Sequence, residues 1–149
     1  MGGRGAYSLR HKHLRRLKYR RRHNMPTFKE IEKGAIPGIK IVQAESGASK
    51  SKMADYSITS EFYATKDKEG KISHLRVFDP QTGAPIAELD FDANEKGYVD
   101  KTIHIHEFTK VTRSKHASRI KGRDITSQEL KKYAEQIKNI REYNRKVGS

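Results

Sequence analysis

The sequence predicts an α+β fold in which an antiparallel β-meander of about four strands is packed on one face by helices, including a long C-terminal helix. Between residues 56 and 108, short runs with an apolar residue at every second position alternate with turn-forming residues. Such runs are typical of consecutive strands joined by hairpins. After residue 126 the apolar spacing becomes helical. With 149 residues and 34% hydrophobic residues, we expect one modest core in a single domain over residues 26–149.

We expect the four strands of the meander at residues 56–65, 71–78, 86–91 and 102–108. Residues 79–83 (Asp-Pro-Gln-Thr-Gly) are a strong turn sequence between the second and third of these strands.

Three further elements flank the meander. A capping-box pattern at Thr27 and Glu30 predicts a short helix over residues 27–34. A Pro-Gly turn then leads into a short strand over residues 39–42. A second capping box at Thr126 predicts a helix to about residue 147. Its apolar face, which we expect to cover the sheet, consists of Leu130, Tyr133, Ile137 and Ile140.

Charge is distributed unevenly over a chain of net charge +14. Residues 1–23 hold nine Lys/Arg and no acid, residues 24–109 hold eleven Lys/Arg and fourteen Asp/Glu, and residues 110–149 hold twelve Lys/Arg and four acids. Two basic segments flanking an acidic middle predict a polyanion partner, RNA in particular, with strongly salt-dependent binding. The alternative for residues 1–25 is a flexible, solvated arm that aids solubility. The predicted nucleic-acid-binding residues are Arg15, Arg16, Arg20, Arg21, Arg22, Arg113, Lys115, Arg119, Lys121 and Arg123.

Composition also bears on the compartment. The chain has no cysteine, so it offers neither disulfides nor thiolate metal ligands. We find no apolar run of transmembrane length and no apolar segment after the N-terminal charges that would form a secretory signal. We therefore expect a cytoplasmic protein, of the host or of a target cell, with no membrane partner.

A polar face of the sheet follows from the alternation of side chains along the strands. Residues two apart in a strand share a face, and helices covering one face collect the apolar sets there. The opposite face is then expected to hold His74, Arg76, Glu88, Asp90, Thr102, His104 and His106.

These residue types suit cleavage of RNA without a metal or any other cofactor. Histidine exchanges protons near neutral pH, and arginine binds phosphate and stabilises charge that develops on it. One group would take the 2′-hydroxyl proton while that oxygen attacks phosphorus, and a second would protonate the leaving 5′-oxygen. The candidate catalytic residues are His104, His106, Arg76 and His74.

Two other functions fit the same residues. His104 and His106, with Glu88 or Asp90, resemble a histidine–carboxylate site, which would make the protein a metal-dependent hydrolase. Alternatively the polar face is only a solvated surface, and the chain is a non-enzymatic nucleic-acid-binding or structural protein, which the resemblance described next would make a phage structural protein.

Three segments carry a resemblance to known proteins. The opening Met-Gly-Gly-Arg-Gly-Ala, the run over residues 75–106 and the capped helix from Thr126 resemble small proteins of phages and mobile elements of Gram-positive bacteria. They also resemble C-terminal extensions of phage head-morphogenesis proteins. Several such modules look like members of the nuclease-toxin superfamily of barnase, EndoU, colicin tRNases and RelE.

That resemblance implies a small antiparallel sheet against helices and metal-independent action on RNA. It nominates His104 and His106 as the acid and base, with Arg76 as the phosphate ligand. It also implies an antidote protein or a phage protein as a partner.

Overall fold

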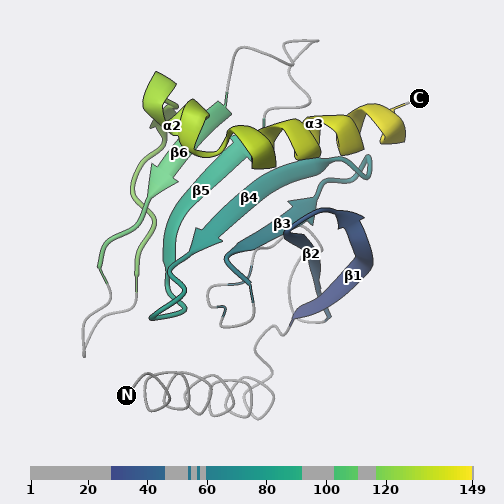
Figure 1. The fold of residues 1–149 in the computed structure, drawn as a ribbon. Coiled ribbons are helices and arrows are strands. Elements are labelled where there is room, and N and C mark those ends of the chain that lie inside the picture. The colour runs from purple at the N-terminus through teal and green to yellow at the C-terminus, as the bar shows by residue number, and fades with distance from the viewer. Residues whose placement is uncertain are drawn as a thin grey trace.

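A seven-stranded sheet carries two helices on one face in the computed structural model, which describes residues 28–45, 54, 57, 60–91, 103–110 and 117–148 (Figure 1). The predicted arm, residues 1–25, lies outside the described residues. The strands stand in the sheet in the order in which they occur in the chain. They are β1 (Phe28–Ile36), β2 (Ile39–Ala44), β3 (Phe62–Lys66), β4 (Ile72–Phe78), β5 (Pro85–Phe91), β6 (Ile103–Glu107) and β7 (Arg123–Asp124). The helices are α2 (Ser127–Lys132) and α3 (Ala134–Val147).

The predicted four-strand meander with one long helix is wrong. The sheet has seven strands, and β2 pairs with β3 in parallel while every other neighbouring pair is antiparallel. A parallel pair needs a crossover connection instead of a hairpin, and residues 45–61 separate these two strands in the chain. Strands β3 to β6 do form an antiparallel series. Strands β4, β5 and β6 lie close to the expected positions, whereas β3 begins at Phe62 and not at residue 56.

The helix expected over residues 27–34 is also wrong, because this segment is strand β1. A helix of this length is marginal on its own, whereas a hairpin with β2 pairs its backbone groups directly. The hairpin closes at the predicted Pro-Gly turn, where Ile36 lies opposite Ile39. Gly38 has φ of 72°, a left-handed conformation that glycine adopts without steric cost.

The C-terminal helix is split in two. The capping box is confirmed, since the Thr126 hydroxyl accepts from the backbone of Glu129 and the Glu129 carboxylate accepts from the backbone of Thr126. The helix then breaks at Tyr133, where φ is −107° and ψ is 19°. Tyr133 stays buried in the core, whereas Leu130, on the short first helix, is 39% exposed.

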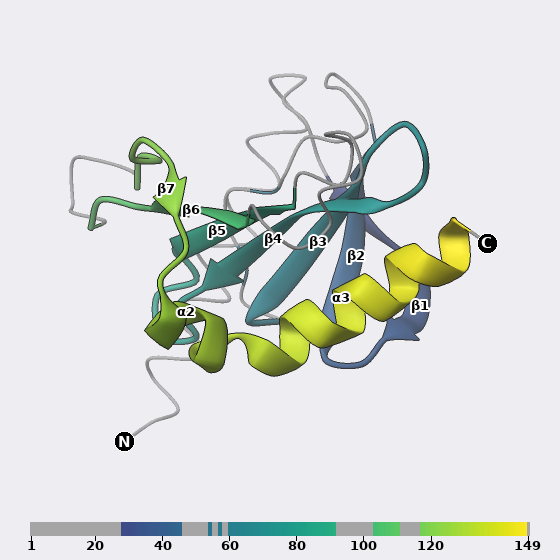
Figure 2. The same ribbon diagram turned by 90° about the horizontal axis from the view of Figure 1, so that it is seen from above.

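The core lies between the sheet and α3, which crosses the strands diagonally (Figure 2). Cross-strand register places Leu75, Leu89 and Ile105 side by side, each at most 2% exposed. Ile137 and Ile140 of α3 belong to the same buried cluster. The predicted sorting of apolar residues onto one face of these strands is therefore confirmed. No helix in the described part of the chain is long and apolar enough to cross a membrane.

Asn144 fastens α3 to β4. Its side-chain oxygen accepts from the Ile72 backbone N–H at 2.7 Å, and its amide nitrogen donates to the Ile72 carbonyl at 3.2 Å. We expect Asn144→Ala to lower the free energy of unfolding by about 1–3 kcal/mol, because two backbone groups lose their partner. Asn139→Ala on the same helix is the matched control, with a change below about 0.5 kcal/mol. Urea denaturation measures both, and equal losses would contradict this role for Asn144.

Candidate active site

Cross-strand pairing gathers the predicted polar residues on the face of the sheet opposite the helices. His74, Asp90 and His104 lie opposite one another on β4, β5 and β6. Arg76, Glu88 and His106 form the next row. The shared face predicted for these six residues is confirmed, and Thr102 lies outside the described residues.

Glu88 is the most deeply buried member, at 1% exposure. One carboxylate oxygen accepts from Arg76 through Nη2 at 2.7 Å and Nε at 3.1 Å. The other accepts from Nη1 of Arg119 at 2.8 Å. Burial raises the pKa of Glu88, but the charge of Arg76 and the hydrogen bonds from Arg119 and Arg76 together leave that pKa below its usual value. Glu88 is thus an ionised carboxylate held between two guanidinium groups.

Arg76, the predicted phosphate ligand, already donates hydrogen bonds to other groups of the protein. Its Nη1 donates to the Ala54 carbonyl at 2.9 Å, in addition to the bonds with Glu88, and its side chain is 12% exposed. The guanidinium carbon also lies 5.1 Å from the centre of the Phe108 ring. Arg119 bonds the same carboxylate but is half exposed, so it presents cationic surface to solvent where Arg76 does not.

His106 makes a hydrogen bond through each of its two ring nitrogens. The His106 Nδ1 lies 2.8 Å from the Ile120 carbonyl oxygen, which only accepts, so Nδ1 carries a hydrogen. The His106 Nε2 lies 2.9 Å from Asp90 Oδ2, and this contact also needs a hydrogen between the two atoms. Both ring nitrogens are therefore engaged, which fixes the orientation of the His106 ring against Asp90.

The carboxyl group of Asp90 is partly buried beside His74 and His106. Burial raises the pKa of its carboxyl group above the usual value; the positive charge of His74 opposes this shift and the negative charge of Glu88 adds to it. Its Oδ1 is buried and has no hydrogen-bond partner among the described residues. The Nε2 atom of His74 lies 3.5 Å from that oxygen.

Of the three histidines in the described part of the chain, His74 and His104 are the more accessible, with side chains 33% and 42% exposed. The Nδ1 of His74 is 2.9 Å from the Ser73 hydroxyl. The Nε2 of His104 is 3.4 Å from Asp124 on β7, at the edge of the sheet. These two side chains therefore stand on either side of Asp90 with access to solvent, whereas His106 is 15% exposed and is held by hydrogen bonds at both ring nitrogens.

Residues 117–124, which we call the strap, close over His106. The Thr109 N–H donates to the Ser118 carbonyl and the Ile120 N–H donates to the Glu107 carbonyl, and these hydrogen bonds hold the strap along the end of β6. Gly122 lies so close that a Cβ atom there would stand 2.7 Å from Cε1 and 2.8 Å from Nε2 of the His106 ring. Only glycine allows this approach without moving the histidine.

We expect Gly122→Ala to displace His106 and to lower the free energy of unfolding by about 1–3 kcal/mol, because the ring loses its bonds to Asp90 and Ile120. A double-mutant cycle tests the cause. In a His106→Ala background, where the ring is gone, the same glycine substitution should cost less than about 0.5 kcal/mol. A full cost in that background would contradict the contact.

The predicted nucleic-acid-binding residues differ in whether the structure describes them and in how exposed they are. Those of the arm, with Arg113 and Lys115, lie outside the described residues. Arg119 bonds Glu88, and Arg123 makes two bonds to Glu129, at 2.7 and 2.9 Å, and one to Glu107 at 3.3 Å. Lys121 is exposed. Of the three described residues, Arg119 and Lys121 are therefore better placed than Arg123 to meet a phosphate.

A metal would find a different set of ligands from the one predicted. His74, Glu88 and Asp90 each offer an atom within 4.8 Å of the others. Both oxygens of Glu88 already accept from arginines, however, and a divalent cation there would face two positive charges. The donor set therefore fits a metal poorly.

Two features of this site are not predicted by the sequence. They are the bond from Arg119 to Glu88 and the close approach of Gly122 to His106. Arg119 and Gly122 both belong to the strap, whose position beside β6 follows from pairing between distant residues. An isolated glycine in a basic segment does not indicate that the segment lies against a histidine.

Comparison with protein-family models, with curated proteins and with solved structures found no match. The resemblance to nuclease toxins therefore stays a prediction.

Proposed function

We propose that this protein is a metal-independent ribonuclease that cleaves RNA by attack of the 2′-hydroxyl group. The observation that carries the proposal is the partly buried Asp90 carboxyl, with a raised pKa, among three histidines of which two are open to solvent. Titratable groups perturbed by burial and by specific charged neighbours concentrate at catalytic sites.

The roles follow from exposure and position. His74 and His104 stand on strands either side of β5, about 10 Å apart along the sheet. One takes the proton of the 2′-hydroxyl as its oxygen attacks phosphorus, and the other protonates the departing 5′-oxygen. The products are a 2′,3′-cyclic phosphate and a free 5′-hydroxyl group, with one proton moved from one histidine to the other.

The remaining residues position this pair. Arg119 offers its exposed guanidinium to the phosphate. Glu88 holds Arg119 in place through a hydrogen bond, and Arg76 in turn bonds the other oxygen of Glu88. His106 fixes Asp90, whose charge would stabilise a protonated His74.

The experiment is incubation of total RNA with the purified chain in excess chelator. Cleavage supports the proposal, and activity that the chelator abolishes would replace it with a metal-dependent hydrolase. Intact RNA with reduced mobility would support the other candidate, a non-enzymatic nucleic-acid-binding protein, which the net charge of +14 favours.

A further inference from the structure

Two apolar side chains, Ile86 and Phe108, continue the face of the candidate active site along the strands. Glu88 lies opposite His106, and the antiparallel register that joins them continues to Ile86 of β5 and Phe108, the residue after β6. Side chains two residues apart in a strand share a face. Ile86 and Phe108 therefore lie on the polar face, about 7 Å along the strands from Glu88 and His106.

Two contacts fix the place of the Phe108 ring. The guanidinium carbon of Arg76 lies 5.1 Å from the ring centre, so the ring lies against a residue of the polar face. On its other side Phe108 lies directly opposite Arg119 of the strap, in an antiparallel bridge. Side chains that lie opposite each other in such a pair are neighbours on one face. The Phe108 ring therefore stands beside the half-exposed guanidinium of Arg119.

The apolar surface of this pair is open to solvent. Ile86 is 42% exposed, and Phe108 is partly exposed. On the opposite face of β5, which the helices cover, Ala87 and Leu89 are at most 5% exposed. Exposed apolar atoms beside an exposed cation suit a ligand that combines a flat ring with negative charge.

We propose that Ile86 and Phe108, which we call the base platform, hold a nucleobase of RNA next to the phosphate bound by Arg119. The base stacks on the Phe108 ring and packs against Ile86, while the phosphate pairs with the guanidinium. The inference rests on the proposed function, which places the phosphate at Arg119. Neither side chain of the platform has a polar atom, so the platform holds any base without reading its edge.

Charge favours nucleic acid over a protein partner at the platform. Arg119 and Lys121 of the strap are both exposed, and the chain has a net charge of +14. Single-stranded nucleic acid brings a ring and a negative charge with every nucleotide, which matches an aromatic side chain next to cations.

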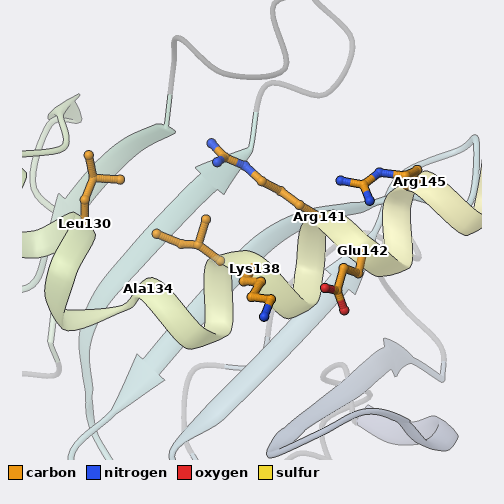
Figure 3. A pocket seen from close by; sticks show the side chains of 7 residues that line it. Leu130, Ala134, Lys138, Arg141, Glu142 and Arg145 are labelled. Atoms are coloured by element: carbon orange, nitrogen blue, oxygen red, sulfur yellow. The ribbon is translucent and has the colours of Figure 1, made fainter.

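A hollow beside α3 also joins cations to apolar atoms, on the helical side of the sheet (Figure 3). None of the seven side chains that line it is aromatic, so it lacks a surface on which a base could stack. Arg145, which lies at this hollow and is exposed, is therefore a suitable control for Arg119.

The test measures binding of two fluorescein-labelled strands of twelve nucleotides to the full chain by fluorescence anisotropy. One is oligothymidylate, and the other has the same phosphates but an abasic sugar at every position. Neither has a 2′-hydroxyl group, so binding is measured whether or not the chain cleaves RNA. We expect Phe108→Leu to weaken binding of oligothymidylate about fivefold or more, and binding of the abasic strand less than about twofold. Phe108→Tyr keeps the ring and should bind both strands as the native chain does.

Two matched controls separate stacking from charge and from stability. Phe62→Leu makes the same change on the helical side of the sheet, where Phe62 packs against the core, and should change binding of either strand less than about twofold. Arg119→Gln should weaken both strands by the same factor, because it removes a phosphate contact. Arg145→Gln should weaken them less than Arg119→Gln does.

Four outcomes would overturn the platform. The first is equal affinity of the native chain for the two strands, or no binding of either. The second is oligothymidylate binding that Phe108→Leu leaves unchanged. The third is an equal loss with both strands for Phe108→Leu, and the fourth is a loss of the same size for Phe62→Leu, since both would mean a structural effect. A chain that shows the expected pattern but cleaves no RNA would keep the platform and refute the ribonuclease, so the two failures are distinguishable.

Discussion

Glu88→Gln is expected to lower the free energy of unfolding by about 3–5 kcal/mol. The carboxylate is 1% exposed and accepts from both Arg76 and Arg119. Glutamine has the same shape but only one acceptor oxygen, so its amide NH₂ faces a guanidinium donor. The charge of Arg76, at 12% exposure, then loses its counter-ion, and breaking a buried pair from one side carries a cost of this size. Urea denaturation near pH 7 measures the difference.

Acid provides an internal check on this prediction. Because the pKa of Glu88 is lowered in the folded protein, its contribution to stability is complete above the usual carboxyl pKa. The contribution is lost as pH falls through the lowered value. The difference in the free energy of unfolding between the native chain and Glu88→Gln should therefore become smaller at acid pH. Glu61→Gln, at an exposed position, should change stability by less than about 0.5 kcal/mol. A gap for Glu88→Gln that stays constant with pH would show that charge is not its cause.

His74→Ala and His104→Ala are each expected to lower kcat/KM for RNA cleavage about 10²- to 10⁴-fold, the range for loss of a general acid or base. Both side chains are at least one-third exposed, so stability should change by less than about 1 kcal/mol. Initial rates on a short fluorescent RNA, with thermal unfolding alongside, separate the two effects.

Ser73→Ala is the control for these histidine variants. It removes only the hydroxyl group 2.9 Å from the His74 Nδ1, so we expect a loss of less than about tenfold in kcat/KM. If all three variants cleave RNA at the native rate, the acid–base roles of His74 and His104 are wrong.

Local alternation along the strands was enough to predict which residues share the polar face. A side chain two residues along a strand must return to the same face. The apolar residues Leu75, Leu89 and Ile105 mark the opposite face as the core side, and the structure buries all three. The capping box at Thr126 was equally predictable because it depends on two residues three apart.

The remaining parts of the fold depend on distant residues. Residues 28–36 carry a helix-start pattern, but pairing with β2 outweighs it. The parallel pairing of β2 with β3 and the approach of Gly122 to His106 join segments whose meeting no local pattern marks. The break at Tyr133 interrupts a continuous helical spacing, because local spacing does not show where a helix changes direction to fit the core.

The most direct test of the proposed chemistry uses two synthetic oligonucleotides of one sequence in excess chelator, one of RNA and one with every 2′-hydroxyl replaced by hydrogen. The proposal predicts that only the RNA is cleaved, that its fragments end in a 2′,3′-cyclic phosphate, and that both oligonucleotides bind. Cleavage of the deoxy oligonucleotide, or RNA fragments with a 5′-phosphate, would contradict attack by the 2′-hydroxyl group.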